Sequence, residues 1–234
     1  MKTNFLQSVK YFKRLVRTVI IVFFVGSIVW VLLSSFIPVY LTPLMLIRSF
    51  ESIIEGKIPR NEKIWVSIDA ISPNMVQAVV ASEDNLYLTH YGFSFEDIER
   101  AIKHNQKGRR MRGGSTISQQ TAKNVFLWPE RSYFRKGLEA YFTVLIELLW
   151  TKERIMEVYL NIVETGNGVY GVQAASLKFF GKDAKRLTKS QAALIAASLP
   201  NPRKFRIDNP SRFMFRRQAK IISLMGKLPA VKFE

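Results

Sequence analysis

The longest apolar stretch of the chain lies near its N-terminus. No charged residue occurs between Thr18 and Ile47, and the twenty positions from Thr18 to Ile37 are almost all apolar. About 20 apolar residues are enough to cross the hydrocarbon core of a bilayer. A secretory signal would have a shorter apolar region followed by a small-residue cleavage site. The pattern therefore predicts one transmembrane helix; a buried core helix is the alternative, and the length of the run argues against it.

The charges on either side of this stretch predict its orientation. Five basic residues precede it: Lys2, Lys10, Lys13, Arg14 and Arg17. Such residues tend to remain in the cytoplasm. The basic residues on the far side (Arg48, Lys57 and Arg60) weaken the asymmetry, but long domains translocate largely regardless of charge. We expect a cytoplasmic basic tail over 1–17, a transmembrane helix with a membrane-interfacial segment over 18–47, and an extracytoplasmic domain over 48–234.

The rest of the chain shows mostly helical periodicity. Ser72 and Pro73 suit an N-cap and a first helical position, and the apolar stripe that follows ends near Glu83. Further capping signals and stripes predict helices over 94–106, 116–126, 132–150, 152–161, 171–180 and 189–198, and a basic terminal helix from about residue 211. Residues 64–68 are expected to be extended. Because strands and helices do not alternate, the fold class is predicted to be mainly α.

The net charge restricts the partners. Lys and Arg number 35 against 18 Asp and Glu, a formal charge of +17. Such an excess favours nucleic acid, a membrane surface or a phosphorylated substrate. An extracytoplasmic domain does not meet nucleic acid, so we expect none. The densest basic run could hold anionic membrane lipids; it comprises Lys103, Lys107, Arg109, Arg110 and Arg112. The chain has no cysteine and hence no disulfide.

A loop rich in glycine, hydroxyl and amide groups is the first candidate for chemistry. It reads G-G-S-T-I-S-Q-Q from Gly113 to Gln120. Backbone N–H groups, hydroxyls and amides at the start of a helix can surround an anion, and Lys123 lies one turn further on. An ordinary capped helix after a glycine loop explains the same residues equally well. The lysine of an NTPase phosphate loop is missing.

Two carboxylates bracket this loop. Glu83, at the end of a predicted helix, could act as a general base; the alternative is an exposed glutamate at a helix end. His90 is better explained as a structural residue that braces the loop than as a catalytic one.

The second carboxylate, Glu139, follows a basic pair. Arg135 and Glu139 are spaced for a surface ion pair within a helix. However, Glu139 shares its apolar stripe with Phe142 and Ile146, so it could instead face a cleft. Arg131, just upstream, could hold a phosphate through two parallel hydrogen bonds.

Together these segments resemble the peptidoglycan glycosyltransferases. The family motif E-D-x-x-F-x-x-H-x-G matches the run from Glu83 to Gly92, with Tyr87 in place of phenylalanine. The motif G-x-S-T-I-T-Q-Q matches except at Ser118. The motifs R-K-x-x-E and K-x-x-I-L-E-x-Y-L-N match from Arg135 and from Lys152, the latter with Met156 for leucine; a last motif, L-T-x-x-E-A-A-L-L-A-x-x-P, matches loosely. The L-T-P-L-M-L-I-R run before the domain indicates the monofunctional biosynthetic branch.

The resemblance implies a function and a fold. The family polymerises lipid II, a disaccharide-pentapeptide on polyprenyl pyrophosphate, in cell wall synthesis, and the implied fold is α-rich and lysozyme-like. In the implied mechanism Glu83 deprotonates the 4-hydroxyl of the acceptor. That oxygen then attacks the anomeric carbon of the growing strand, so the configuration of this carbon is inverted and polyprenyl diphosphate is released. The leaving group would be held, directly or through Mg²⁺ or Mn²⁺, by Glu139 and by other residues of the motifs: Ser115, Thr116, Gln119, Gln120, Lys123, Arg131, Arg135 and Lys136. His90 completes the set of residues that the resemblance places at the substrate.

The expected partners are lipid II, the growing glycan strand, membrane lipids and other proteins of wall synthesis. Two alternatives remain open at this point. One is a lysozyme-like enzyme that cleaves peptidoglycan, which would not need the residues that hold pyrophosphate. The other is a non-catalytic membrane scaffold for wall synthesis, against which the intact Glu83 and Glu139 argue.

Overall fold

The computed structural model describes residues 2–94, 96, 99, 114–130 and 132–233. These form two compact units, Met1–Ile37 and Pro38–Glu234. The first unit is essentially one helix, α1 (Lys2–Ser34), in which Lys10–Ser34 is long and apolar enough to cross a membrane. The helix continues without a break through the basic residues before Thr18. Most of the helix predicted over 94–106, and all of the dense basic run, lie outside the described residues.

The second unit begins with an amphipathic helix, α2 (Pro43–Ile54). Thr42 caps it, and Pro43 occupies a first-turn position where its missing N–H costs nothing. Its apolar side chains Leu46, Phe50 and Ile53 are exposed, whereas its polar face is turned toward the protein. The helix extends seven residues beyond residue 47, where the interfacial segment was predicted to end.

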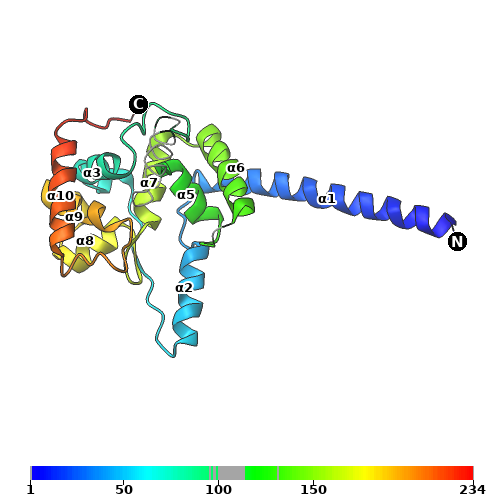
Figure 1. The fold of residues 1–234 in the computed structure, drawn as a ribbon, viewed down its shortest axis with the longest axis horizontal. Helices are drawn as coiled ribbons and strands as arrows, with labels where there is room; N and C mark the ends of the chain where they lie inside the picture. The colour runs from blue at the N-terminus through cyan, green and yellow to red at the C-terminus, as the bar shows by residue number, and fades with distance from the viewer. Residues whose placement is uncertain (1, 95, 97–98, 100–113, 131, 234) are drawn as a thin grey trace. The chain divides into compact units, whose positions relative to one another are not determined.

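Three helices pack together behind the predicted loop (Figure 1): α5 (Ile117–Phe126), α6 (Tyr133–Leu149) and α7 (Lys152–Ile162). Their N-caps are Thr116, Ser132 and Thr151, each with a side-chain oxygen that accepts from the backbone N–H three positions on. The rings of Phe126 and Phe142 stack 4.6 Å apart between α5 and α6. The helices predicted from these sequence signals are confirmed to within two residues at their ends.

A second group consists of α3 (Pro73–Glu83), α9 (Lys189–Ser198) and α10 (Arg212–Met225). Every residue of α9 from Ala192 to Ser198 is buried. The four alanines in this run let α3 and α10 approach α9 closely, and both pack on it (Figure 1). This packing holds the position of α3 and of Glu83, which is its last residue.

The sequence did not predict the small sheet of the second unit. Its strands are β1 (Glu62–Lys63), β2 (Glu164–Gly166) and β3 (Val169–Tyr170), with β3 in the middle. The extended segment lies at 62–63 and not at the predicted 64–68. Strands of two or three residues are too short to show the alternation that identifies a strand. Helix α8 (Val172–Phe180) follows the hairpin, and two short 3₁₀ turns are Ile68–Ala70 and Ala184–Arg186.

Replacing Gly171 with alanine should destabilise the domain strongly. Gly171 has φ 79° and ψ 161°, a region open essentially to glycine alone. An added Cβ would also lie 2.6 Å from the carbonyl oxygen of Asn161. We expect a loss of about 3 kcal/mol, from backbone strain and overpacking together, measured by denaturant unfolding of the detergent-solubilised chain.

Gly181 provides the matched control. It is left-handed with φ 63°, but an added Cβ meets nothing within 4 Å. Gly181→Ala should therefore cost only about 1 kcal/mol. Equal losses at both positions would show that the contact with Asn161 is not what restricts position 171.

Candidate active site

The carboxylate of Glu83 lies at the end of α3 and is held by neutral and charged donors. Its Oε2 accepts from Nε2 of Gln120 at 3.2 Å. Its Oε1 accepts from the hydroxyl of Ser82 at 3.2 Å and from Nη2 of Arg217 at 3.4 Å. The Glu83 side chain is 13% exposed. The structure thus gives Glu83 a defined, half-buried position and not that of an exposed helix end.

Tyr159 of α7 fixes the orientation of Gln120. Its hydroxyl donates to Oε1 of Gln120 at 3.3 Å, which leaves the amide nitrogen to donate to Glu83. Complete burial raises the pKa of Tyr159 well above its ordinary value, and the charges of Glu83 and Asp84 add to this. Tyr159 therefore remains a neutral donor at physiological pH.

His90 braces the loop that follows Glu83. Its Nε2 lies 2.9 Å from Oδ1 of the buried Asp84, and Oδ2 of Asp84 accepts from the backbone N–H of Ile117 at 3.0 Å. Asp84 therefore ties the 84–92 loop to the first turn of α5. The ring of His90 is therefore directed at Asp84, which agrees with the structural interpretation of this residue.

A partly buried ion pair holds the same loop from the other side. Nζ of Lys152 donates to the carbonyl of His90 at 2.6 Å and to Glu147 at 2.8 Å, and Glu147 also accepts from the hydroxyl of Ser118. Gly92 lies against these residues, since an added Cβ would be 2.7 Å from a methyl carbon of Thr143. The loop is thus held on α5, α6 and α7 at once.

The residues of the predicted anion loop serve different purposes. Thr116 and Gln119 form a capping box at the start of α5, and the hydroxyl of Thr116 donates to the carbonyl of Gly92 at 2.6 Å. Ser115 is exposed, and Lys123 is half-buried in the last turn of α5. Gln120 donates to the carboxylate of Glu83. The capped-helix interpretation accounts for Thr116 and Gln119, while the exposed Ser115 is accessible to a ligand.

Glu139 lies in a buried cluster of charge on α6. Its Oε2 accepts from Nη1 of Arg135 at 2.8 Å, and its Oε1 accepts from Nζ of Lys136. The side chains of Arg135 and Glu139 are only 10% and 4% exposed, whereas that of Lys136 is 50% exposed. The simple surface ion pair considered above is therefore wrong, because burial makes this pair a fixed structural element.

The described contacts do not join the two glutamates directly. The side-chain hydrogen bonds of Glu139 come from its own helix, and those of Glu83 from α3, α5 and α10. Helix α5 connects them, because it packs on α6 and carries Gln120. Arg131, the remaining predicted residue, lies outside the described part of the chain.

Sequence reasoning missed Arg217, the charged partner of Glu83. The basic character of the terminal helix was visible, but 134 positions separate the two residues. Tyr159, Asp84 and Lys152 stood in the matched motifs without an assigned role. Their motif positions were the signal that could have identified them as supports of the site.

The described residues contain no preformed cluster of metal ligands. Among them, no group of three or more His, Cys, Asp or Glu side chains could hold a metal ion. Both oxygens of Glu139 are already paired with cations. In phosphate-binding sites Mg²⁺ is commonly held by one or two carboxylates together with substrate phosphates. The expected Mg²⁺ or Mn²⁺ therefore stays a prediction.

Comparison with known proteins agrees with this arrangement of motifs. A family model described as Transglycosylase matches residues 51–226. The chain is 52% identical to the biosynthetic peptidoglycan transglycosylase of Bacteroides thetaiotaomicron, over 94% of this chain and 89% of that protein. It is 54% identical to the protein of the same name from Bdellovibrio bacteriovorus, over 91% of this chain and 84% of the relative. The chain therefore belongs to the biosynthetic peptidoglycan transglycosylases, enzymes that polymerise glycan strands in cell wall synthesis.

Proposed function

We propose that the chain joins lipid II units with Glu83 as the general base. Glu83 takes the proton from the 4-hydroxyl of the acceptor sugar, and that oxygen attacks the anomeric carbon of the growing strand. The bond from this carbon to the pyrophosphate oxygen breaks, so polyprenyl diphosphate leaves and the configuration changes from α to β. The observation that carries this assignment is the half-buried carboxylate of Glu83, held by Gln120, Ser82 and Arg217.

The neighbouring carboxylates support the choice of Glu83. Asp84 is engaged by His90 and a backbone N–H, and Glu147 by Lys152 and Ser118. Glu139 is neutralised by two cations within its own helix. By contrast, Glu83 has one cation at 3.4 Å and two neutral donors at 3.2 Å. Among these four carboxylates, Glu83 has the longest contacts with its donors, so it is the one most open to an acceptor hydroxyl.

The cluster on α6 is suited to the leaving group. Lys136 is half-exposed and can turn from Glu139 toward a diphosphate, while the buried Glu139–Arg135 pair keeps the helix start charged and ordered. Lys123 and Arg131 would add charge in this region. Fixed charges aimed at developing negative charge are usually the largest single contribution to catalysis. A bound Mg²⁺ or Mn²⁺ would supply further positive charge to stabilise the leaving diphosphate.

Product analysis tests the reaction as written. Purified chain incubated with lipid II should give β-linked glycan and one molecule of polyprenyl diphosphate for each disaccharide added, measured by NMR of the anomeric proton and by lipid chromatography. Retention of the α configuration, or release of the monophosphate, would contradict the mechanism. Short fragments released from purified sacculi would instead favour the lysozyme-like alternative.

The chain's lack of cysteine allows a direct test of the proposed topology. We propose a single-pass anchor in the cytoplasmic membrane with the N-terminus in the cytoplasm and the catalytic domain outside. With single cysteines introduced as Gln7→Cys and Lys232→Cys, a membrane-impermeant maleimide should label only the second in cells whose inner membrane is intact. Both should be labelled once that membrane is permeabilised. Labelling of Gln7→Cys alone in intact cells would reverse the orientation.

A further inference from the structure

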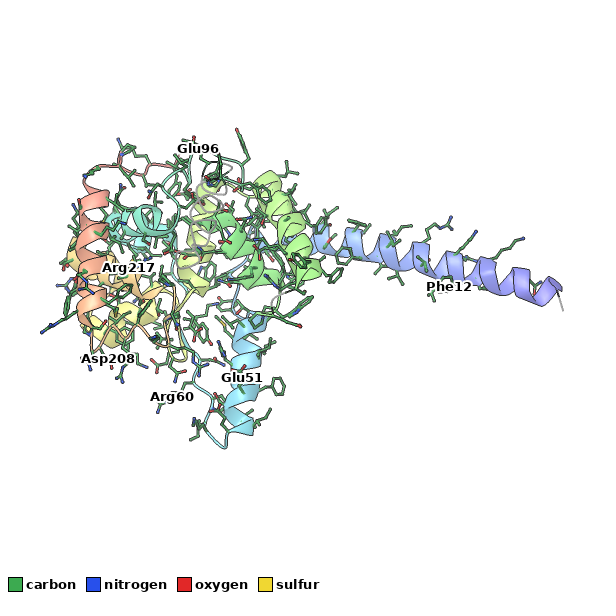
Figure 2. The ribbon with its side chains drawn as sticks, in the orientation of Figure 1. Phe12, Glu51, Arg60, Glu96, Asp208 and Arg217 are labelled. Atoms are coloured by element: carbon green, nitrogen blue, oxygen red, sulfur yellow. The ribbon has the colours of Figure 1, made fainter. Side chains whose placement is uncertain are left out.

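A polar cavity of about 330 Å³ lies against the polar face of α2. Its walls come from α2, from residues 57–60, from the β2–β3 hairpin and from Arg203. Figure 2 labels Glu51 and Arg60, which line this cavity, and Arg217, which belongs to the candidate active site and lies elsewhere in the domain. The cavity is much larger than the roughly 30 Å³ that one water molecule occupies. None of the proposed catalytic residues lines it.

Three buried polar atoms that belong to lining residues have no hydrogen-bond partner among the described residues. They are Nε of Arg48, Oε1 of Glu164 and the hydroxyl of Tyr170. Tyr170 is fully buried and Glu164 is 9% exposed. Burial raises the pKa of Glu164, and burial together with the charge of Glu164 raises that of Tyr170 to about 12. Buried polar atoms are normally satisfied, so a ligand with both donors and acceptors would complete this site.

The charges around the cavity indicate what kind of ligand fits. Arg48 pairs with Glu51, and Lys57 with Glu55, each at 2.7 Å. The other charged residues that line the cavity are Arg60, Arg203 and Glu164. In the described part of the chain, no carboxylate lies within ion-pair distance of the two arginines. Two guanidinium groups favour a carboxylate or phosphate, and Glu164 favours an amine or amide N–H. A ligand that carries an anion and a donor matches all three.

A second cavity of about 350 Å³ extends the site. It shares Arg60, Asn167 and Arg203 with the first, and it continues past Lys178 and Arg206. The ligand can therefore be longer than one amino acid. An extended peptide advances about 3.3–3.6 Å per residue, so several residues could lie across the hairpin.

The shared wall is rigid. The backbone N–H of Glu62 donates to the carbonyl of Gly168 at 2.9 Å, and an added Cβ at Gly168 would lie 2.5 Å from the carbonyl oxygen of Arg60. The hairpin and the segment that carries Arg60 are thus fastened together before any ligand binds. Such preorganisation reduces the entropic cost of binding.

We propose that these adjoining cavities bind a short peptide through its carboxylate and its N–H or amine groups, and that the natural occupant is the peptide stem of lipid II or of the glycan strand. The identity of the occupant rests on the proposed function. A phospholipid headgroup has related charges but fits less well. The exposed apolar side chains of α2, such as Phe50 and Ile53, lie on the face of the helix opposite to Arg48 and Glu51. An α-helix with its side chains is about 10–12 Å wide, so acyl chains beside that apolar face would be separated from the cavity.

Calorimetric titration of the full chain in detergent with free stem pentapeptides tests the site. Two probes are used, one with L-lysine and one with meso-diaminopimelic acid at the third position. At least one should bind, and Arg60→Gln and Arg203→Gln should each weaken its binding about tenfold, the usual worth of one charge-assisted hydrogen bond. Arg212→Gln removes an exposed arginine from the start of α10, outside both cavities, and should bind as the wild type does.

Other outcomes would overturn the proposal. These are no binding of either peptide, equal binding by the Arg203→Gln and Arg212→Gln proteins, or binding of glycerophosphoethanolamine in place of peptide. The titration needs no catalysis, so it stands even if the chain makes no polymer. In polymerisation assays, Arg203→Gln should raise KM for lipid II with a complete stem but not for lipid II with its stem trimmed. An equal rise in KM for both substrates would show that the peptide stem is not the occupant.

Discussion

A Glu83→Gln enzyme should make almost no glycan polymer from lipid II. The replacement keeps the shape of the side chain and its contact with Ser82, but the amide cannot take the proton from the acceptor hydroxyl. A positioned general base typically contributes about 10²–10⁴-fold to rate, and we expect a loss of that size in kcat. Quantitative gels of labelled polymer, taken at initial rates, measure it.

Glu153→Gln is the matched control for this variant. Glu153 is an exposed glutamate in the first turn of α7, away from the donors that hold Glu83. It should polymerise at the wild-type rate. Full activity of the Glu83→Gln enzyme would remove Glu83 as the base. If wild-type and Glu83→Gln chains supported growth equally in cells that depend on this gene, the scaffold alternative would be favoured.

The second large effect is expected at Glu139. In a Glu139→Gln chain, Arg135 would remain buried with its charge uncompensated, since its side chain is 10% exposed. Removing one partner of a buried ion pair costs about 3–5 kcal/mol. We expect a loss of stability of that order together with a heavy loss of polymerisation, because Lys136 also loses the carboxylate that positions it. Denaturant unfolding and the polymerisation assay measure the two effects on one preparation.

A double variant separates the structural effect from the catalytic one. Arg135→Met combined with Glu139→Gln removes both buried charges, so most of the lost stability should return. Polymerisation should not return with it, because the charges proposed to hold the diphosphate are gone. Recovery of both would show that Glu139 serves only to stabilise α6.

The helices could be predicted because their signals are local. Thr116 with Gln119, and Thr188 with Gln191, form capping boxes where the sequence predicts helix starts, and Gly181 ends α8 in a left-handed conformation. Each signal acts within four residues and needs no tertiary contact. The sheet was missed for the opposite reason: Glu62 pairs with Val169, more than a hundred positions away.

The sequence predicted which motif residues form the site, but not which hydrogen bonds they make with one another. The sequence identified Glu83, Gln120 and Glu139, yet it could not show that Gln120 reaches Glu83 while Gln119 turns back to cap α5. Periodicity fixes the face of a residue on its helix, but hydrogen-bond partners depend on how helices pack. The contact of Arg217 with Glu83, and the buried atoms beside α2 that lack a partner, follow from the packing of the helices and cannot be seen in the sequence.

The most direct measurement incubates the purified, detergent-solubilised wild-type chain with labelled lipid II and Mg²⁺ and resolves the products by size. If the chain alone joins lipid II units, a ladder of glycan polymers will form and lengthen with time. Absence of polymer across several detergents, and with Mn²⁺ in place of Mg²⁺, from protein that is shown to be folded would contradict polymerisation by this chain alone.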